Sequence, residues 1–266
     1  VYAFDSTTID LCLNIFWWAT FRKAKAAVKL HTLFDVKTSI PVFTHVTAAS
    51  VHDVNGLDKL VYETDGYYII DRGYVDFERL YIIDQHEAFF VTRAKSNTKL
   101  KRMSSLKPDK FKGVMCDQRV ILTGHYSYKS YPKQFRRIKF YDADQNRTFT
   151  FLSNNLTLPA IEIAMLYKYR WRIELFFKWI KQHLKIKSFW GTSANAVKVQ
   201  VYIAIITYTM VAIIKSKLKL KQSTYEILQV LNVSLLDKTP LRQLFENTLS
   251  QDVKEQNYTQ LEINLI

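Results

Sequence analysis

Two short apolar runs in the sequence are each followed directly by an aspartate. Val1–Phe4 is followed by Asp5, and Gly66–Ile70 is followed by Asp71. Runs of this length, rich in aromatic and β-branched residues, are typical of buried strands. Ligands of open α/β sheets bind beyond the carboxyl ends of the strands. We therefore expect both carboxylates at one edge of a sheet.

Strand and helix patterns alternate along the rest of the chain. Alternating apolar positions predict a hairpin and a further strand, over 26–36, 40–48 and 88–92. Helical spacing is found in five segments: 52–59, 76–85, 160–187, 194–217 and 224–231. This order favours an α/β domain in which helices flank a mixed sheet.

A strongly basic block interrupts that order between Arg93 and Lys139. It contains fourteen Lys and Arg residues and only two acids, Asp109 and Asp117, in a chain of formal net charge +14. From this block to about Pro159, short β-like pieces follow one another between polar turns, at 120–123, 137–141 and 148–152. Aromatic residues are interleaved with the cations: Phe111, Tyr126, Tyr128, Tyr131 and Phe135. We interpret the block as a β-rich insertion that presents a phosphate-binding groove with rings for bases, the alternative being a solvated loop.

A single carboxylate, Glu174, lies within the basic helix predicted over 160–187. At about 100° per residue, one face of this helix is apolar and is expected to pack on the core: Leu166, Tyr169, Ile173, Phe176, Phe177, Ile180 and Leu184. Tyr167, Arg170, Glu174 and Lys181 form a polar stripe beside it. An Arg170–Glu174 ion pair would contribute about 0.2–0.5 kcal/mol, but it accounts for only two members of the stripe.

A metal site accounts for the whole stripe. Three carboxylates, Asp5, Asp71 and Glu174, can hold two Mg²⁺ ions, which prefer oxygen ligands. Such a pair supports in-line phosphoryl displacement. The neighbouring cations would bind flanking phosphates, and the aromatic rings would receive bases.

The spacing of the stripe resembles a known signature. Tyr167-x-x-Arg170-x-x-x-Glu174, then six residues and Lys181, is similar to the Tyr-Arg-Glu-Lys signature of family-4 insertion-sequence transposases, which are DDE enzymes with a ribonuclease-H-like core. The texts FDSTTIDL, IIDRGYVDFERL and RWRIELFFKWIKQHL around the three acids look similar too. The resemblance extends from Val1 to about Lys217.

The resemblance implies a role for each matching residue. Asp5, Asp71 and Glu174 correspond to the metal-binding catalytic triad, with two Mg²⁺ ions, or Mn²⁺ as a substitute. Residues that correspond to DNA contacts are Tyr167, Arg170, Trp171, Lys181 and Arg72. Trp171 lies where a relative places a ring near a base flipped out during hairpin chemistry. The implied partners are double-stranded DNA, as transposon ends and as target, and a second copy in a synaptic dimer.

The resemblance also implies a division of the chain. We expect a first part of the catalytic core over 1–97, a β-rich basic insertion over 98–158, a second part of the core over 159–220, and a C-terminal helical segment over 221–266. The chain begins at Val1 within an apparent strand, so we expect that an N-terminal segment is missing.

Several classes of protein are disfavoured by the sequence. Cys12 and Cys116 form no CxxC pair, which argues against a disulfide framework or zinc knuckle and fits a reducing, cytoplasmic setting. The family resemblance implies that this setting is bacterial. No glycine-rich phosphate loop is found. The apolar run Val201–Ile214 is too short to span a bilayer and is expected to be a core helix. Two alternatives to a transposase stay open: a ribonuclease-H-like nuclease or resolvase, and an inactive transposase-derived DNA-binding protein.

Overall fold

The computed structural model describes residues 1–22, 25–186 and 188–245, and residues 246–266 of the predicted C-terminal segment lie outside this description. The chain forms two compact units, Val1–Ala204 and Ile205–Ile266. The first unit contains every strand among the described residues. The four-part division predicted from the sequence stays a prediction.

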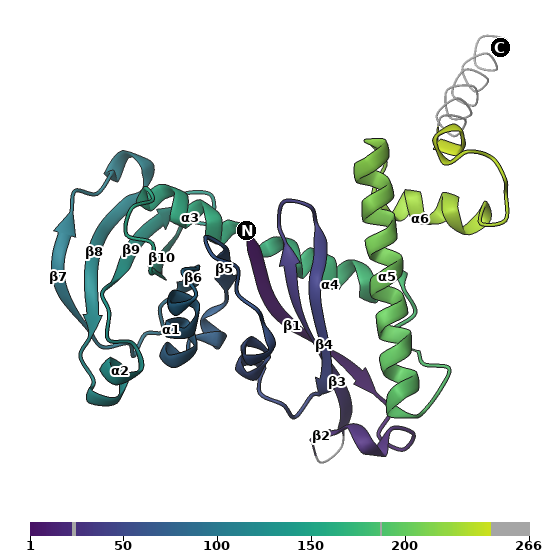
Figure 1. The fold of residues 1–266 in the computed structure, drawn as a ribbon, viewed down its shortest axis with the longest axis horizontal. Coiled ribbons are helices and arrows are strands. Elements are labelled where there is room, and N and C mark those ends of the chain that lie inside the picture. The colour runs from purple at the N-terminus through teal and green to yellow at the C-terminus, as the bar shows by residue number, and fades with distance from the viewer. Residues whose placement is uncertain (23–24, 187, 246–266) are drawn as a thin grey trace, which may run out of the picture. The chain divides into compact units, whose positions relative to one another are not determined.

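The described part of the first unit is built on one ten-stranded mixed sheet (Figure 1). Its strands are β1 (Tyr2–Leu11), β2 (Thr20–Arg22), β3 (Lys25–Asp35), β4 (Ile40–Ala48), β5 (Tyr67–Ile70), β6 (Phe89–Arg93), β7 (Leu100–Leu106), β8 (Val114–Leu122), β9 (Phe135–Asp142) and β10 (Arg147–Ser153). Their order is β2-β3-β1-β5-β6-β10-β9-β8-β7, with β4 also paired to β3. Neighbours β1, β5 and β6 are parallel, and the other pairs are antiparallel.

Helices connect and cover the strands. The α-helices are α1 (Phe77–Gln85), α2 (His125–Ser130), α3 (Ala160–Lys168), α4 (Trp171–His183), α5 (Ala194–Leu218) and α6 (Thr224–Val233). Short 3₁₀ helices are η1 (Trp17–Ala19), η2 (Asp53–Lys59), η3 (Arg72–Tyr74) and η4 (Lys110–Lys112). The helix start predicted near 52–59 is therefore a 3₁₀ helix.

Successive side chains of the parallel strand β5 belong to two different apolar clusters, one on each face of the sheet. Tyr68 and Ile70 belong to one apolar cluster, which α1 completes with Leu80 and Ile83. Ile69, between them in sequence, belongs to a second cluster, which α3 completes with Ile163. Successive side chains of a strand point to opposite faces, so both faces of the central sheet are covered.

The basic block extends the sheet itself. Its predicted strand pieces lie in β8, β9 and β10, and β10 pairs with both β9 and β6. The prediction that its rings are available to bases was wrong for Tyr131 and Phe135, which are 0% and 1% exposed. Both rings pack edge to face in the core, with centroids 5.2 Å apart. Phe111, Tyr126 and Tyr128 are exposed.

Helix α5 (Ala194–Leu218) matches the helix predicted over 194–217, but it is more exposed than its apolar run predicted. It has 25 residues, and Ile203, Ile206 and Met210 are more than half exposed. By length and composition alone it could cross a membrane, a test that core helices of soluble proteins also pass. The prediction of a buried core helix is therefore right for one face of the run, which includes Val201 and Val211, and wrong for the other, which is apolar but exposed.

Candidate active site

The register of β1 and β5 places the first two acids side by side. The last residues paired between these parallel strands are Phe4 and Ile70, and each is followed by an aspartate, Asp5 or Asp71. The prediction that Asp5 ends its strand was wrong, since β1 continues to Leu11. It continues because β3 pairs with all ten of its residues, whereas β5 pairs with only three.

The third acid, Glu174, lies on α4, which is a separate helix from α3. The prediction of one continuous helix over 160–187 was wrong, because Tyr169 and Arg170 form a tight turn between the two helices. The amide of Arg170 donates to the carbonyl of Tyr167 (3.1 Å), and that of Arg172 donates to the carbonyl of Tyr169 (3.0 Å). The turn changes the phase of the helix, so Tyr169, predicted to pack inward, is 41% exposed.

The packed face predicted for α4 itself is confirmed. Its buried residues are Ile173, Phe176, Phe177 and Ile180. Phe176 packs on Phe34 of β3, with ring centroids 5.3 Å apart. This packing holds α4 against the sheet and brings Glu174 to the edge where Asp5 lies.

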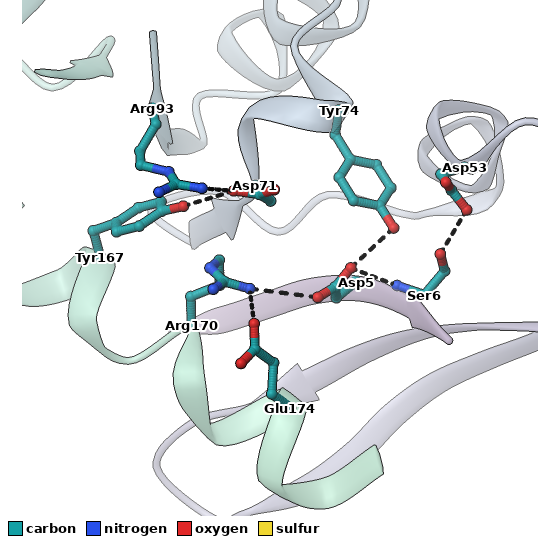
Figure 2. A network of polar contacts seen from close by, with 9 residues as sticks. All are labelled: Asp5, Ser6, Asp53, Asp71, Tyr74, Arg93, Tyr167, Arg170 and Glu174. Atoms are coloured by element: carbon teal, nitrogen blue, oxygen red, sulfur yellow. Dashed lines mark hydrogen bonds and ion pairs between the residues drawn. The ribbon is translucent and has the colours of Figure 1, made fainter. Parts of the chain in front are cut away.

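Arg170 lies between two of the acids (Figure 2). Its Nη1 is 2.6 Å from Oε1 of Glu174 and 3.5 Å from Oδ2 of Asp5. The simple i,i+4 ion pair considered from the sequence is therefore present, and Asp5 shares it. The Nε atom of Arg170 is buried and has no hydrogen-bond partner among the described residues. The guanidinium group thus has a donor left for a further ligand.

Asp71 is held by a different pair of residues. Its Oδ1 accepts hydrogen bonds from Nη2 of Arg93 (2.8 Å) and from the hydroxyl of Tyr167 (2.9 Å). Burial alone would raise the pKa of Asp71, but the bonds from Arg93, from the Arg72 amide and from Tyr167 together lower it. Asp71 is therefore firmly ionised.

Asp5 has the opposite electrostatic character. Burial raises its pKa to about 6, despite hydrogen bonds to Oδ1 from the Ser6 amide (2.8 Å) and the Tyr74 hydroxyl (3.2 Å) and the nearby charge of Arg170. Asp71 raises it slightly further. The negative charge on Asp5 is therefore incompletely compensated by its surroundings.

A cavity of about 280 Å³ adjoins this network. Its lining includes Arg93, Phe149, Tyr167, Arg170, Trp171 and Glu174. The guanidinium groups of Arg93 and Arg170 lie 5.6 Å and 5.8 Å from the centroid of the Tyr167 ring. Trp171 is 58% exposed. The cavity thus combines cations with aromatic faces.

Not every predicted DNA contact joins the network. Lys181 lies further along α4, where its Nζ donates to the carbonyl of Thr8 in β1 (2.8 Å). Arg72 is exposed in η3 and takes no part in the contacts of Figure 2. The structure therefore gathers Asp5, Asp71 and Glu174 with Tyr167 and Arg170, and leaves Lys181 and Arg72 at the margins.

Comparison with known proteins assigns the family. Residues 1–210 match the family model described as the transposase DDE domain. The chain belongs to the DDE transposase family. Among curated relatives of this DDE domain, a protein of Sinorhizobium fredii named as the transposase y4zB is 36% identical over 214 residues, covering 79% of this chain. A protein of Geobacillus stearothermophilus named as a transposase for insertion sequence element IS5377 is 30% identical over 253 residues, covering 94%.

These relatives are longer than this DDE domain. The chain spans 59% of the first and 63% of the second. Among solved structures, a piggyBac transposase synaptic complex with hairpin DNA matches 92% of this chain and 56% of its own, with a TM-score of 0.52 at 11% identity. At this identity the match speaks for the fold alone. The predicted ribonuclease-H-like mixed sheet flanked by helices is confirmed.

The side chains of the DDE domain fit a divalent cation in donor type and charge. Three carboxylates face two guanidinium groups, those of Arg93 and Arg170. Carboxylate oxygens are the ligands that Mg²⁺ prefers, and burial, the main cause of the raised pKa of Asp5, favours a cation at this carboxylate. In the described ranges, no three His, Cys, Asp or Glu residues stand close enough together to hold one ion. Arg170 pairs with both Asp5 and Glu174.

Sequence reasoning missed Arg93, Tyr74 and Ser6 of the DDE domain's network. Arg93 is the last residue of β6 and directly follows the apolar run predicted over 88–92, as Asp71 follows its own apolar run, which was an available signal. Tyr74 lies three residues after Asp71, and no sequence pattern connects it with Asp5. Asp53 accepts a hydrogen bond from the Ser6 hydroxyl (2.6 Å) and pairs with Lys29 (2.8 Å).

Proposed function

We propose that this DDE domain cleaves and joins DNA in the cut-and-paste transposition of an insertion sequence. The observation that carries the proposal is the convergence of Asp5, Asp71 and Glu174, from three separate elements, on one network beside a cationic and aromatic cavity. The named transposases among its relatives support the same substrate, DNA. Two Mg²⁺ ions, or Mn²⁺, are proposed as cofactors, and the bacterial cytoplasm as the location.

The three carboxylates are the proposed metal ligands. When bound, the metal would activate the attacking oxygen and stabilise the leaving oxygen of a phosphodiester. Arg170 occupies the space between Asp5 and Glu174 through ion pairs of 3.5 Å and 2.6 Å. Transfer of its guanidinium group to a DNA phosphate would release both carboxylates for the metal. Arg93 can make the same exchange at Asp71.

The remaining residues of the signature are proposed to hold the DNA. Burial raises the pKa of Tyr167 well above its ordinary value, so its hydroxyl stays a neutral donor. Trp171 and the ring of Tyr167 border the cavity and could receive a base displaced from the duplex. Lys181 and Arg72 are proposed as phosphate contacts. A hairpin intermediate and a synaptic homodimer are further parts of the proposal.

Cleavage and joining of a labelled duplex test this function. With the element's own ends and Mn²⁺, the chain should nick the 3′ end and join it to a plasmid. Glu174→Ala should abolish cleavage and leave DNA affinity nearly unchanged, whereas Arg170→Ala should weaken binding. Cutting without joining would favour a nuclease or resolvase. DNA binding without any metal-dependent cutting would favour an inactive DNA-binding protein.

A further inference from the structure

Two tryptophan side chains are exposed on loops beyond the carboxyl end of β1. Trp17 in η1 is 76% exposed, and Trp190 in the connection from α4 to α5 is 88% exposed. Large aromatic side chains left in water on adjacent loops are typical of a binding surface.

The residues beside each exposed ring tie the two loops together. Nε1 of Trp18 donates to the carbonyl of Thr192 (2.8 Å). The ring of Phe16 packs edge to face on Phe189, with centroids 6.0 Å apart. Trp17 lies between Phe16 and Trp18, and Trp190 lies between Phe189 and Thr192. The residues that flank each exposed tryptophan are thus anchored, while the rings of Trp17 and Trp190 face solvent.

Gln200 of α5 fixes the backbone that carries Trp190. Its Oε1 accepts from the Trp190 amide (3.2 Å), and its Nε2 donates to the carbonyls of Lys185 (2.6 Å) and Ser188 (2.7 Å). A Cβ at Gly191 would lie 2.6 Å from that of Ala196, so only glycine allows this close approach. The loop is therefore preorganised, which lowers the entropic cost of binding through the Trp190 ring.

The charge around these rings matches a polyanion. Among the described side chains of residues 14–21, 25, 184–186 and 188–192, Lys25 and Lys185 are cations and none is an acid. Lys25 and Lys185 among them are exposed, and Asp10 is an exposed acid on the adjoining strand. Cations interleaved with aromatic rings are the common surface for nucleic acid. A second copy of this chain, with its net charge of +14, would meet like charges here.

The distance along β1 relates this surface to the acids. From Asp5 to Leu11 the strand advances six residues, about 20 Å at its usual rise, which corresponds to about six base pairs of duplex. Lys181, bonded to Thr8, lies between the two. We propose that Trp17 and Trp190 contact duplex DNA about six base pairs from the phosphate held at the acids. This inference rests on the proposed function.

Fluorescence anisotropy with a labelled 30-base-pair duplex tests the contact. Trp17→Ala and Trp190→Ala should each weaken binding by the 266-residue chain about tenfold, because each removes a large aromatic contact with the duplex. Trp17→Phe and Trp190→Phe should retain most of the affinity. Val61→Ala is the matched control, because Val61 is 86% exposed and lies outside both loops.

The outcomes separate this inference from the proposed function. If Arg170→Ala weakens binding while the tryptophan variants behave like Val61→Ala, the inference is wrong and the proposed function stands. If the wild-type chain does not bind the duplex at all, the proposed function fails as well. Sedimentation that shows a dimer lost in the tryptophan variants, at unchanged DNA affinity, would assign the surface to a second copy and overturn the inference.

Two reactions distinguish transposon-end DNA from target DNA as the duplex that the two tryptophans contact. Loss of cleavage on an end duplex would place the contact on transposon DNA, and loss of joining with a pre-cleaved end would place it on target DNA. Either loss supports the contact. Unchanged rates of both reactions in Trp17→Ala and Trp190→Ala would contradict it.

Discussion

At the scale of single residues, the carboxylates of the site differ in the arginine that pairs with each of them. Asp71 is matched by Arg93, and its pKa is lowered, whereas Asp5 shares Arg170 with Glu174 and its pKa is raised to about 6. Two neighbouring acids with opposite shifts of pKa are typical of a functional site. Arg170 is the one cation in the network of Figure 2 that contacts two of the three acids.

His31 gives a prediction at the same scale. Burial, together with the nearby charge of Lys29, lowers its pKa to about 4 from the ordinary value of 6.5. Between these values the unfolded chain binds a proton that the folded chain does not. The contribution of neutral His31 to the free energy of unfolding is therefore complete at pH 7 and is lost as the pH falls towards 4, by about 3 kcal/mol.

Denaturant titrations of matched variants measure that contribution. Asp5 titrates in the opposite sense over the same range, so the informative quantity is the difference between the wild type and His31→Gln. That difference should decrease as the pH falls from 7 to 4. His52→Gln, at an exposed site, should follow the wild-type curve. A pH-independent difference for His31→Gln would contradict the assignment of a neutral buried histidine.

At the scale of elements, the turn between α3 and α4 sets the phase of the helix that carries Glu174. In α4, Ile173 is 0% exposed and Leu175, two residues later, is 45% exposed. Ile173→Ala should lower the free energy of unfolding by about 2–5 kcal/mol, because it leaves a cavity against the sheet. Leu175→Ala should change it by less than about 0.5 kcal/mol. Urea unfolding measures the loss in each variant. Equal losses would contradict the assignment of Ile173 to the packed face of α4 and of Leu175 to its exposed face.

The elements also show what the sequence could and could not predict. The proximity of Asp5 and Asp71 was predictable, because each follows an apolar run and the two runs pair in parallel, although β1 itself continues past Asp5 to Leu11. Ile173 and Phe176 were predictable from their spacing. The turn at Tyr169 and Arg170 was not, since neither residue is a helix breaker and the turn depends on contacts with the sheet. Burial of Tyr131 was not predictable, because it depends on packing against Phe90, which is 41 residues earlier in the sequence, as well as against nearby Phe135.

At the scale of the whole molecule, the net charge of +14 predicts that DNA affinity falls steeply with salt. Each phosphate contact adds about 0.9 to the slope of log affinity against log salt concentration. Arg170→Ala and Lys181→Ala should therefore each reduce the slope by about one. Glu174→Ala should leave it unchanged, because Glu174 is proposed to bind metal. Equal changes in all three variants would contradict this division of roles.

The central claim is that Asp5, Asp71 and Glu174 together form a metal centre. Titration of Mn²⁺ into the chain, followed by electron paramagnetic resonance of the free ion, tests it without requiring DNA or turnover. The wild type should bind Mn²⁺ and the Asp5→Ala/Asp71→Ala variant should bind it at least tenfold more weakly, with the same melting behaviour. Equal binding by the two proteins would contradict the claim.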